Sequence, residues 1–96
     1  MFKPLDPILH NQIRLAIISL LINVENAEFK FLLEKTKASR GNLSVQISRL
    51  KDAGYLSVKK SFRNNYPLTT CQISKEGIIA FEGYVENIAG YINKKE

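Results

Sequence analysis

The sequence contains a single cysteine, Cys71, and a single histidine, His10. One cysteine excludes an internal disulfide and any metal site built from clustered cysteines, and it is typical of a protein from a reducing compartment. His10 has no obvious partner, and we interpret it as a surface or capping residue. Glycine-rich phosphate loops and nucleophile motifs are also missing, so the sequence indicates neither an enzyme nor a cofactor or metal site.

Long apolar segments are missing as well. The most apolar stretch, 13–22, is too short to span a bilayer, which needs about 20 apolar residues, and Arg14 interrupts it. Polar residues near the N-terminus and the lack of a small-residue cleavage site argue against a secretory signal. We therefore expect a cytoplasmic protein with one domain over 1–96, ordered from about 6 to 92 and frayed over 93–96.

Acidic residues are scarce in the middle of the chain. The whole chain of 96 residues carries a net charge of +5. The segment from Lys35 to Arg63 has eight basic residues and one acidic residue, Asp52, so it carries +7 and the remainder carries −2. Such asymmetry is typical of a surface that binds a polyanion such as nucleic acid. An ordinary solvated surface is the alternative interpretation.

Apolar residues recur at helical spacing in four segments. The predicted helices cover 7–22, 27–35, 39–53 and a last segment that ends near residue 92. Residues that are typical of helix N-caps precede them, namely Asp6, Asn26, Ser39 and Ser74. The first and last helices carry more apolar surface than their own core needs, which predicts contact with a partner subunit.

The periodicity changes after Gly54, which stands where a glycine is typical at a helix C-terminus. Residues 55–61 alternate as a strand does, 63–67 form a polar turn that contains proline, and 68–73 form a second β-rich run. Together they predict a β-hairpin. Three helices, a hairpin and a final helix predict a mainly α fold with a β-hairpin, the winged helix-turn-helix arrangement.

The predicted helix 39–53 has two different sides. Leu43, Ile47 and Leu50 recur as a buried stripe. The opposite side carries short polar, amide and arginine side chains, which suit close approach to a DNA groove and pairing with base edges. A solvated helix face would usually hold more Glu and Lys. The predicted DNA-binding residues of this helix are Ser39, Arg40, Gly41, Asn42, Ser44, Val45, Gln46, Ser48 and Arg49.

The predicted hairpin adds basic and amide side chains beside this helix. Its candidate DNA-binding residues are Lys59, Lys60, Arg63, Asn64 and Asn65. A basic hairpin that flanks a recognition helix could reach the backbone or minor groove of the same duplex. Lysines that protect an edge strand from aggregation are the alternative interpretation.

Several motifs resemble a known family. They are Ser39-Arg40-Gly41-Asn42-Leu43-Ser44, Ala53-Gly54-Tyr55-Leu56, Ser61-Phe62-Arg63, Pro67 with Thr69-Thr70, and Ser74-Lys75-Glu76-Gly77. In this combination the chain is similar to small winged-helix transcriptional regulators of the MarR and ArsR type. The resemblance implies a homodimer on DNA, with Asn42 and Ser44 facing the duplex. Val45 stands where relatives often place a basic or polar residue, and it is a candidate for contact with a thymine methyl group.

A dimer would read a palindromic double-stranded DNA site through two recognition helices about 34 Å apart. The candidate interface residues are Ile8, Leu9, Leu15, Ile18, Phe81, Tyr84, Val85, Ile88, Tyr91 and Ile92. The resemblance also permits a small-molecule effector at this interface. A winged helix that binds another protein and no DNA remains the alternative function. We interpret Cys71 as a small core residue rather than a redox group.

Overall fold

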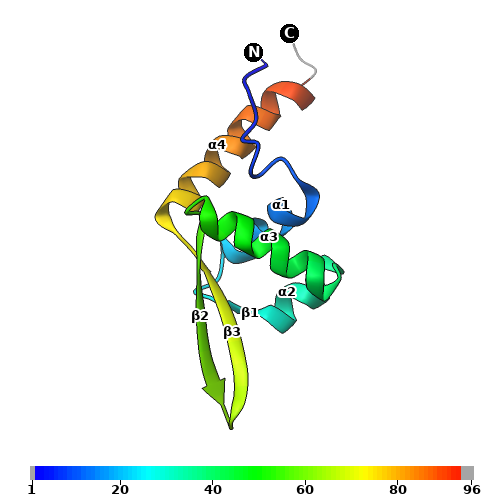
Figure 1. The fold of residues 1–96 in the computed structure, drawn as a ribbon. Coiled ribbons are helices and arrows are strands. Elements are labelled where there is room, and N and C mark those ends of the chain that lie inside the picture. Colours follow the sequence, from blue (N-terminus) through cyan, green and yellow to red (C-terminus); the bar gives the residue numbers. More distant parts are fainter. Residues whose placement is uncertain (1, 94–96) are drawn as a thin grey trace.

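The computed structural model describes residues 2–93, and Figure 1 shows their arrangement. The order of elements in these residues is α1 (Gln12–Leu21), β1 (Ala27–Glu28), α2 (Phe29–Thr36), α3 (Arg40–Asp52), β2 (Leu56–Arg63), β3 (Tyr66–Ile73) and α4 (Lys75–Ile92). The three strands form one antiparallel sheet in the order β1-β3-β2. This order confirms the predicted winged helix-turn-helix fold. Residue 93 caps α4, and the rest of the predicted frayed tail, 94–96, lies outside the described residues.

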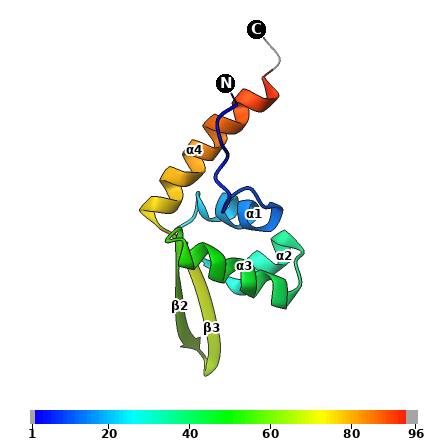
Figure 2. The same ribbon diagram turned by 45° about the horizontal axis from the view of Figure 1, so that its top comes forward.

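One apolar core joins α1, α2, α3 and the base of the sheet. The side chains without any exposed surface are Leu9, Ile17, Ile18, Leu21, Leu32, Leu43, Leu50 and Cys71. The molecule is elongated, with extents of 58 × 25 × 21 Å. The β2–β3 hairpin projects from one end of this core and α4 from the other (Figures 1 and 2). In residues 2–93, none of the helices has the length and apolar character needed to cross a bilayer.

The first helix begins later than the sequence indicates. Asp6 Oδ1 accepts a hydrogen bond from Ile8 N at 2.8 Å. The segment after Asp6 forms only a short turn and does not continue into α1. Asn11 then adopts an extended conformation (φ −154°, ψ 129°), and its side chain caps α1 by accepting from Arg14 N at 3.0 Å. The prediction of a helix from residue 7 with Asp6 as its cap is therefore wrong, because two consecutive capping side chains divide the segment.

The predicted second helix also loses its first turn. Ala27 and Glu28 pair with Cys71 and Thr70 as strand β1, and Glu28 rather than Asn26 occupies the N-cap position of α2. Alanine and glutamate favour helices locally. The hydrogen bonds to β3 override that preference, and no local pattern in the sequence reveals them.

The hairpin turn is tighter than predicted. Asn64 and Asn65 form a two-residue turn, both with positive φ (52° and 66°), which asparagine tolerates better than most residues. Pro67 lies within β3 opposite Phe62. In an antiparallel hairpin the pair beside a two-residue turn exchanges hydrogen bonds and the next pair does not. Pro67 therefore sits in the strand without costing a ladder bond.

The last helix, α4, is buried over only part of its surface. Gly77 and Tyr84 are buried, whereas Val85 is 47% and Ile92 is 69% exposed. A Cβ atom at Gly77 would lie 2.2 Å from the Tyr55 carbonyl oxygen, so glycine allows the start of α4 to press against the end of the α3–β2 connection. The C-terminal end of α4 projects away from the other helices and from the sheet (Figure 2).

Three of the predicted dimer-interface residues belong to the core of the single chain. Leu9 and Ile18 have no exposed surface, and Tyr84 is 8% exposed. Their side chains have almost no surface left for a partner, which corrects the prediction for these positions. Ile8, Leu15, Phe81 and Ile88 are half-buried, while Val85, Tyr91 and Ile92 remain exposed.

Candidate nucleic-acid interface

Helix α3 is fixed to the core along one edge. Ser39 caps it, with its hydroxyl oxygen accepting from Asn42 N at 3.1 Å. Leu43 and Leu50 are fully buried and Ile47 is 6% exposed, as predicted. Gly54 follows the helix with a φ of 83°, a conformation that favours glycine. The cap and the glycine set where α3 begins and ends, and the buried stripe sets which edge faces solvent.

The opposite edge of α3 is open and almost free of acid. Every predicted DNA-binding residue of this helix is exposed except Gln46, which is half-buried. The helix carries a single carboxylate, Asp52, at its last position. The first turn holds no acidic residue, so its unpaired backbone N–H groups meet no competing anion from the helix itself.

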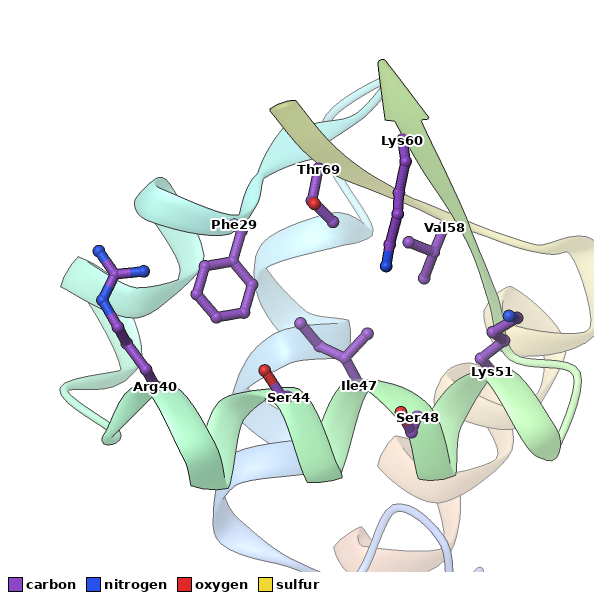
Figure 3. A pocket seen from close by; sticks show the side chains of 9 residues that line it. All are labelled: Phe29, Arg40, Ser44, Ile47, Ser48, Lys51, Val58, Lys60 and Thr69. Carbon is purple, nitrogen blue, oxygen red and sulfur yellow. The ribbon is translucent and has the colours of Figure 1, made fainter. Parts of the chain in front are cut away.

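A cleft of about 440 Å³ lies between one flank of α3 and the hairpin (Figure 3). Three cationic side chains, three hydroxyl side chains and three apolar side chains line it. They are Arg40, Lys51, Lys60, Ser44, Ser48, Thr69, Phe29, Ile47 and Val58. Figure 3 shows Lys60 descending from β2 toward α3. A cleft with this lining favours anionic, hydrogen-bonding ligands.

Lys51 and Phe29 line the cleft but were not among the predicted site residues. Lys51 follows Arg40, Ser44 and Ser48 along one edge of α3, so the helical period alone was a sufficient signal for it. Phe29 comes from α2, and its ring centroid lies 5.9 Å from Arg40 Cζ, a cation–π contact that limits where the arginine points. No sequence pattern linked these two residues.

The hairpin divides its predicted residues between two faces. Lys60 lines the cleft. Lys59 projects from the other face, because successive strand side chains alternate. Arg63 forms two hydrogen bonds to the carboxylate of Glu28 in β1, at 3.0 and 3.2 Å, so its charge is partly matched. Asn64 and Asn65 are exposed at the tip.

Two other side chains of α3 are joined to each other and to α1. Gln46 Nε2 donates to Asn42 Oδ1 at 2.9 Å, and Arg14 Nη1 donates to Gln46 Oε1 at 2.5 Å. In the sequence, Arg14 stands out only as an interruption of an apolar stretch. Since 32 residues separate it from Gln46, no sequence spacing indicated the contact.

Burial raises the pKa of two groups that lie outside the cleft. Tyr55 donates to Asp6 Oδ2 at 2.5 Å, and burial, together with this hydrogen bond and the nearby negative charge, raises the pKa of Tyr55 to about 12. Burial likewise raises the pKa of Cys71 to about 11. His10 Nδ1 lies 3.1 Å from the Tyr84 hydroxyl, a partner that the sequence did not reveal. Residues 2–93 contain no cluster of ligating side chains that would hold a metal ion.

Comparison with known proteins agrees with this geometry. The chain is 32% identical over 81 residues to an uncharacterised protein of Methanocaldococcus jannaschii. The aligned region covers 84% of this chain and 88% of that protein. A transcriptional regulator homologue from Pyrococcus horikoshii OT3 has the same fold, with a TM-score of 0.83, 24% identity, and coverage of 90% of this chain and 85% of that one.

Two further solved structures share the fold. NadR in complex with 4-hydroxyphenylacetate superposes with a TM-score of 0.69 and 24% identity, over 88% of this chain and 62% of that chain. An ArsR family transcriptional regulator superposes with a TM-score of 0.60 and 19% identity, over 93% of this chain and 87% of that chain. The model of the winged helix DNA-binding domain matches residues 13–92. This match shows that the chain belongs to the winged helix DNA-binding domain family.

Proposed function

We propose that this protein is a transcriptional regulator that binds double-stranded DNA sequence-specifically as a homodimer. One observation carries the proposal: the exposed surface of α3 holds hydroxyl, amide and arginine side chains without acid until Asp52, and its flank with Arg40, Ser44 and Ser48 lines the cationic cleft. In this proposal α3 enters the major groove and the β2–β3 hairpin lies as a wing against the flanking backbone or minor groove.

The residues divide by the part of DNA that they would meet. Arg40, Lys51 and Lys60 surround the cleft and suit the phosphates of one strand. Asn42, Ser44, Val45 and Ser48 suit base edges, because their short side chains allow close approach. Arg49 extends the basic edge toward the helix C-terminus. Ser39 and Gly41, in the capped first turn, would let backbone N–H groups approach a phosphate.

A salt titration of DNA binding tests this function. Affinity for duplex DNA should fall steeply with salt, with a log–log slope of about −0.9 for each phosphate neutralised. Selection of preferred duplexes from a randomised library should also return a defined sequence. Absence of binding to any duplex at low salt would reject DNA binding and favour the alternative of a winged helix that binds protein.

The homodimer rests on α4. Phe81, Val85, Ile88 and Ile92 follow one another at the spacing of a helix face, and two of them, Val85 and Ile92, are exposed. A second copy packed there would bury it, and a two-fold axis would present the two α3 helices to a palindromic site. Sedimentation at micromolar concentration should give a dimer, and a monomer would reject this part of the proposal.

A hollow between the N-terminal segment and α4 supports an effector site near this interface. It measures about 500 Å³ and is lined by Leu5, Ile8, Tyr55, Gly83 and Tyr84, among others. A regulator with the same fold was solved with 4-hydroxyphenylacetate, so we propose a small organic molecule here. A thermal-shift screen should find ligands that fail to stabilise Gly83→Leu, whose side chain would fill the hollow. Equal shifts in both proteins would reject this location.

A further inference from the structure

A chain of hydrogen bonds runs from α1 to the exposed edge of α3. It starts at Arg14, whose Nε donates to the Ile8 carbonyl oxygen at 2.6 Å and whose Nη1 donates to Gln46 Oε1 at 2.5 Å. Gln46 Nε2 then donates to Asn42 Oδ1 at 2.9 Å. Arg14 and Gln46 are half-buried, whereas Asn42 is exposed. These hydrogen bonds therefore link a partly covered side chain of α1 to a side chain on the proposed DNA surface.

Because one end of this series of hydrogen bonds is an arginine, each donor and each acceptor in it has only one possible position. A guanidinium group has only donors, so Gln46 must turn its oxygen toward Arg14 and its NH₂ group toward Asn42. Asn42 must then turn Oδ1 toward Gln46, which leaves the N–H groups of Nδ2 for an outside partner. An isolated surface asparagine presents either end of its amide, but this one is held with its donor end outward.

We propose that Arg14, acting through Gln46, is a positioning residue that makes Asn42 a hydrogen-bond donor toward DNA. The inference rests on the proposed DNA binding. An unrestrained asparagine pairs with adenine through both its oxygen and its NH₂ group. With Oδ1 held by Gln46, Asn42 instead favours base edges that carry acceptors, and guanine, with O6 and N7, fits best. Cytosine, which presents an N4 donor to the major groove, is disfavoured.

Base-preference profiles test this role. Preferred duplexes are first selected from a randomised library with the wild-type chain, and the selection is repeated with Arg14→Met, Gln46→Met and Asn42→Ala. All three variants should lose discrimination at the same base pair, by a factor on the order of five to ten. Arg49→Met is the matched control, because it also removes one positive charge but should weaken binding to all sequences alike.

A double variant separates positioning from a general structural effect. Arg14→Met added to Asn42→Ala should broaden the profile no further than Asn42→Ala alone, because the two residues act through one contact. Additive broadening would overturn the proposal. In the free protein, the side-chain NH₂ resonances of Asn42 should shift and sharpen in Arg14→Met, while those of Asn64 at the hairpin tip stay unchanged.

The outcomes distinguish the two levels of inference. If Asn42→Ala broadens the profile while Arg14→Met and Gln46→Met leave it intact, the positioning role is overturned and DNA binding stands. If the wild-type chain selects no sequence, the proposed function fails and the positioning role fails with it. Should Arg14→Met fail to fold, Gln46→Met carries the test, since methionine is close in length to this half-buried glutamine and opens no core cavity.

Discussion

Helices α3 and α4 each bury one edge, and they differ in the kind of side chain on the surface that they expose to solvent. The open edge of α3 carries arginine, serine and amide side chains, and its acid is confined to Asp52 at the last position. The open surface of α4 carries Ile79, Val85 and Ile92 together with three exposed glutamates. The buried edges account for the fold, whereas the solvent edges differ in the partner that they suit: a polyanion for α3 and an apolar surface for α4.

The largest expected effect comes from removing the buried edge of α3. Leu43→Ala should lower the free energy of unfolding by about 2–5 kcal/mol, because it leaves a cavity beneath the helix. Val45→Ala, two residues along and 49% exposed, should change it by less than about 0.5 kcal/mol. Urea denaturation measures both. Similar losses in the two variants would mean that α3 has no distinct buried edge.

The next effect concerns the open edge of α4. Val85→Lys combined with Ile92→Lys should convert the proposed dimer to monomer at micromolar concentration, since each apolar side chain is worth about 1.5–3 kcal/mol when fully buried at an interface. Ile79→Lys is the control, because Ile79 is 59% exposed on a different side of the same helix. Analytical ultracentrifugation measures the outcome. If the control dissociates the dimer equally, the interface lies elsewhere.

A smaller effect is expected from a single charge on the open edge of α3. Arg49→Ala should weaken DNA binding and make the log–log salt slope shallower by about 0.9, the contribution of one phosphate. Lys75→Ala removes the same charge from the start of α4 and should leave the slope unchanged. Fluorescence anisotropy at several salt concentrations measures both, with a thermal melt to show that each variant is folded. An unchanged slope in Arg49→Ala would contradict the proposed face.

The smallest effect separates two adjacent lysines of β2. Lys60→Ala should weaken DNA binding modestly, because Lys60 faces the cleft beside α3. Lys59→Ala should weaken it less, because its side chain leaves the opposite face of the strand. The same anisotropy titrations compare the two. A larger loss in Lys59→Ala would show that DNA meets the other face of the hairpin.

The sequence predicts α3 well because everything that defines it is local. The Ser39 cap, the stripe of Leu43, Ile47 and Leu50, and the terminal Gly54 lie within one short segment. The same holds for the candidate recognition residues, whose exposure follows from the stripe. The hairpin was also expected, although its turn was placed too broadly because Pro67 resembles a turn residue.

Features that join distant segments were not predictable from a single sequence. Ala27 and Glu28 become a strand only because β3 pairs with them. The ion pair between Arg63 and Glu28 spans 35 residues and changes how much of that charge is available to DNA. For the same reason, Leu9 and Ile18 were predicted at the dimer interface. An excess of apolar residues indicates that these side chains must be buried, but not whether the same chain or a partner subunit buries them.

The burial of Cys71 has a practical consequence. Its thiol lies at the centre of the sheet, between Ala27 of β1 and Val58 of β2, and its pKa of about 11 keeps it protonated near neutral pH. A thiol reagent therefore reaches it only when the strands separate. The rate at which the reagent labels Cys71 would therefore report how often the strands separate. A lower labelling rate in the presence of a duplex would show that bound DNA reduces this opening.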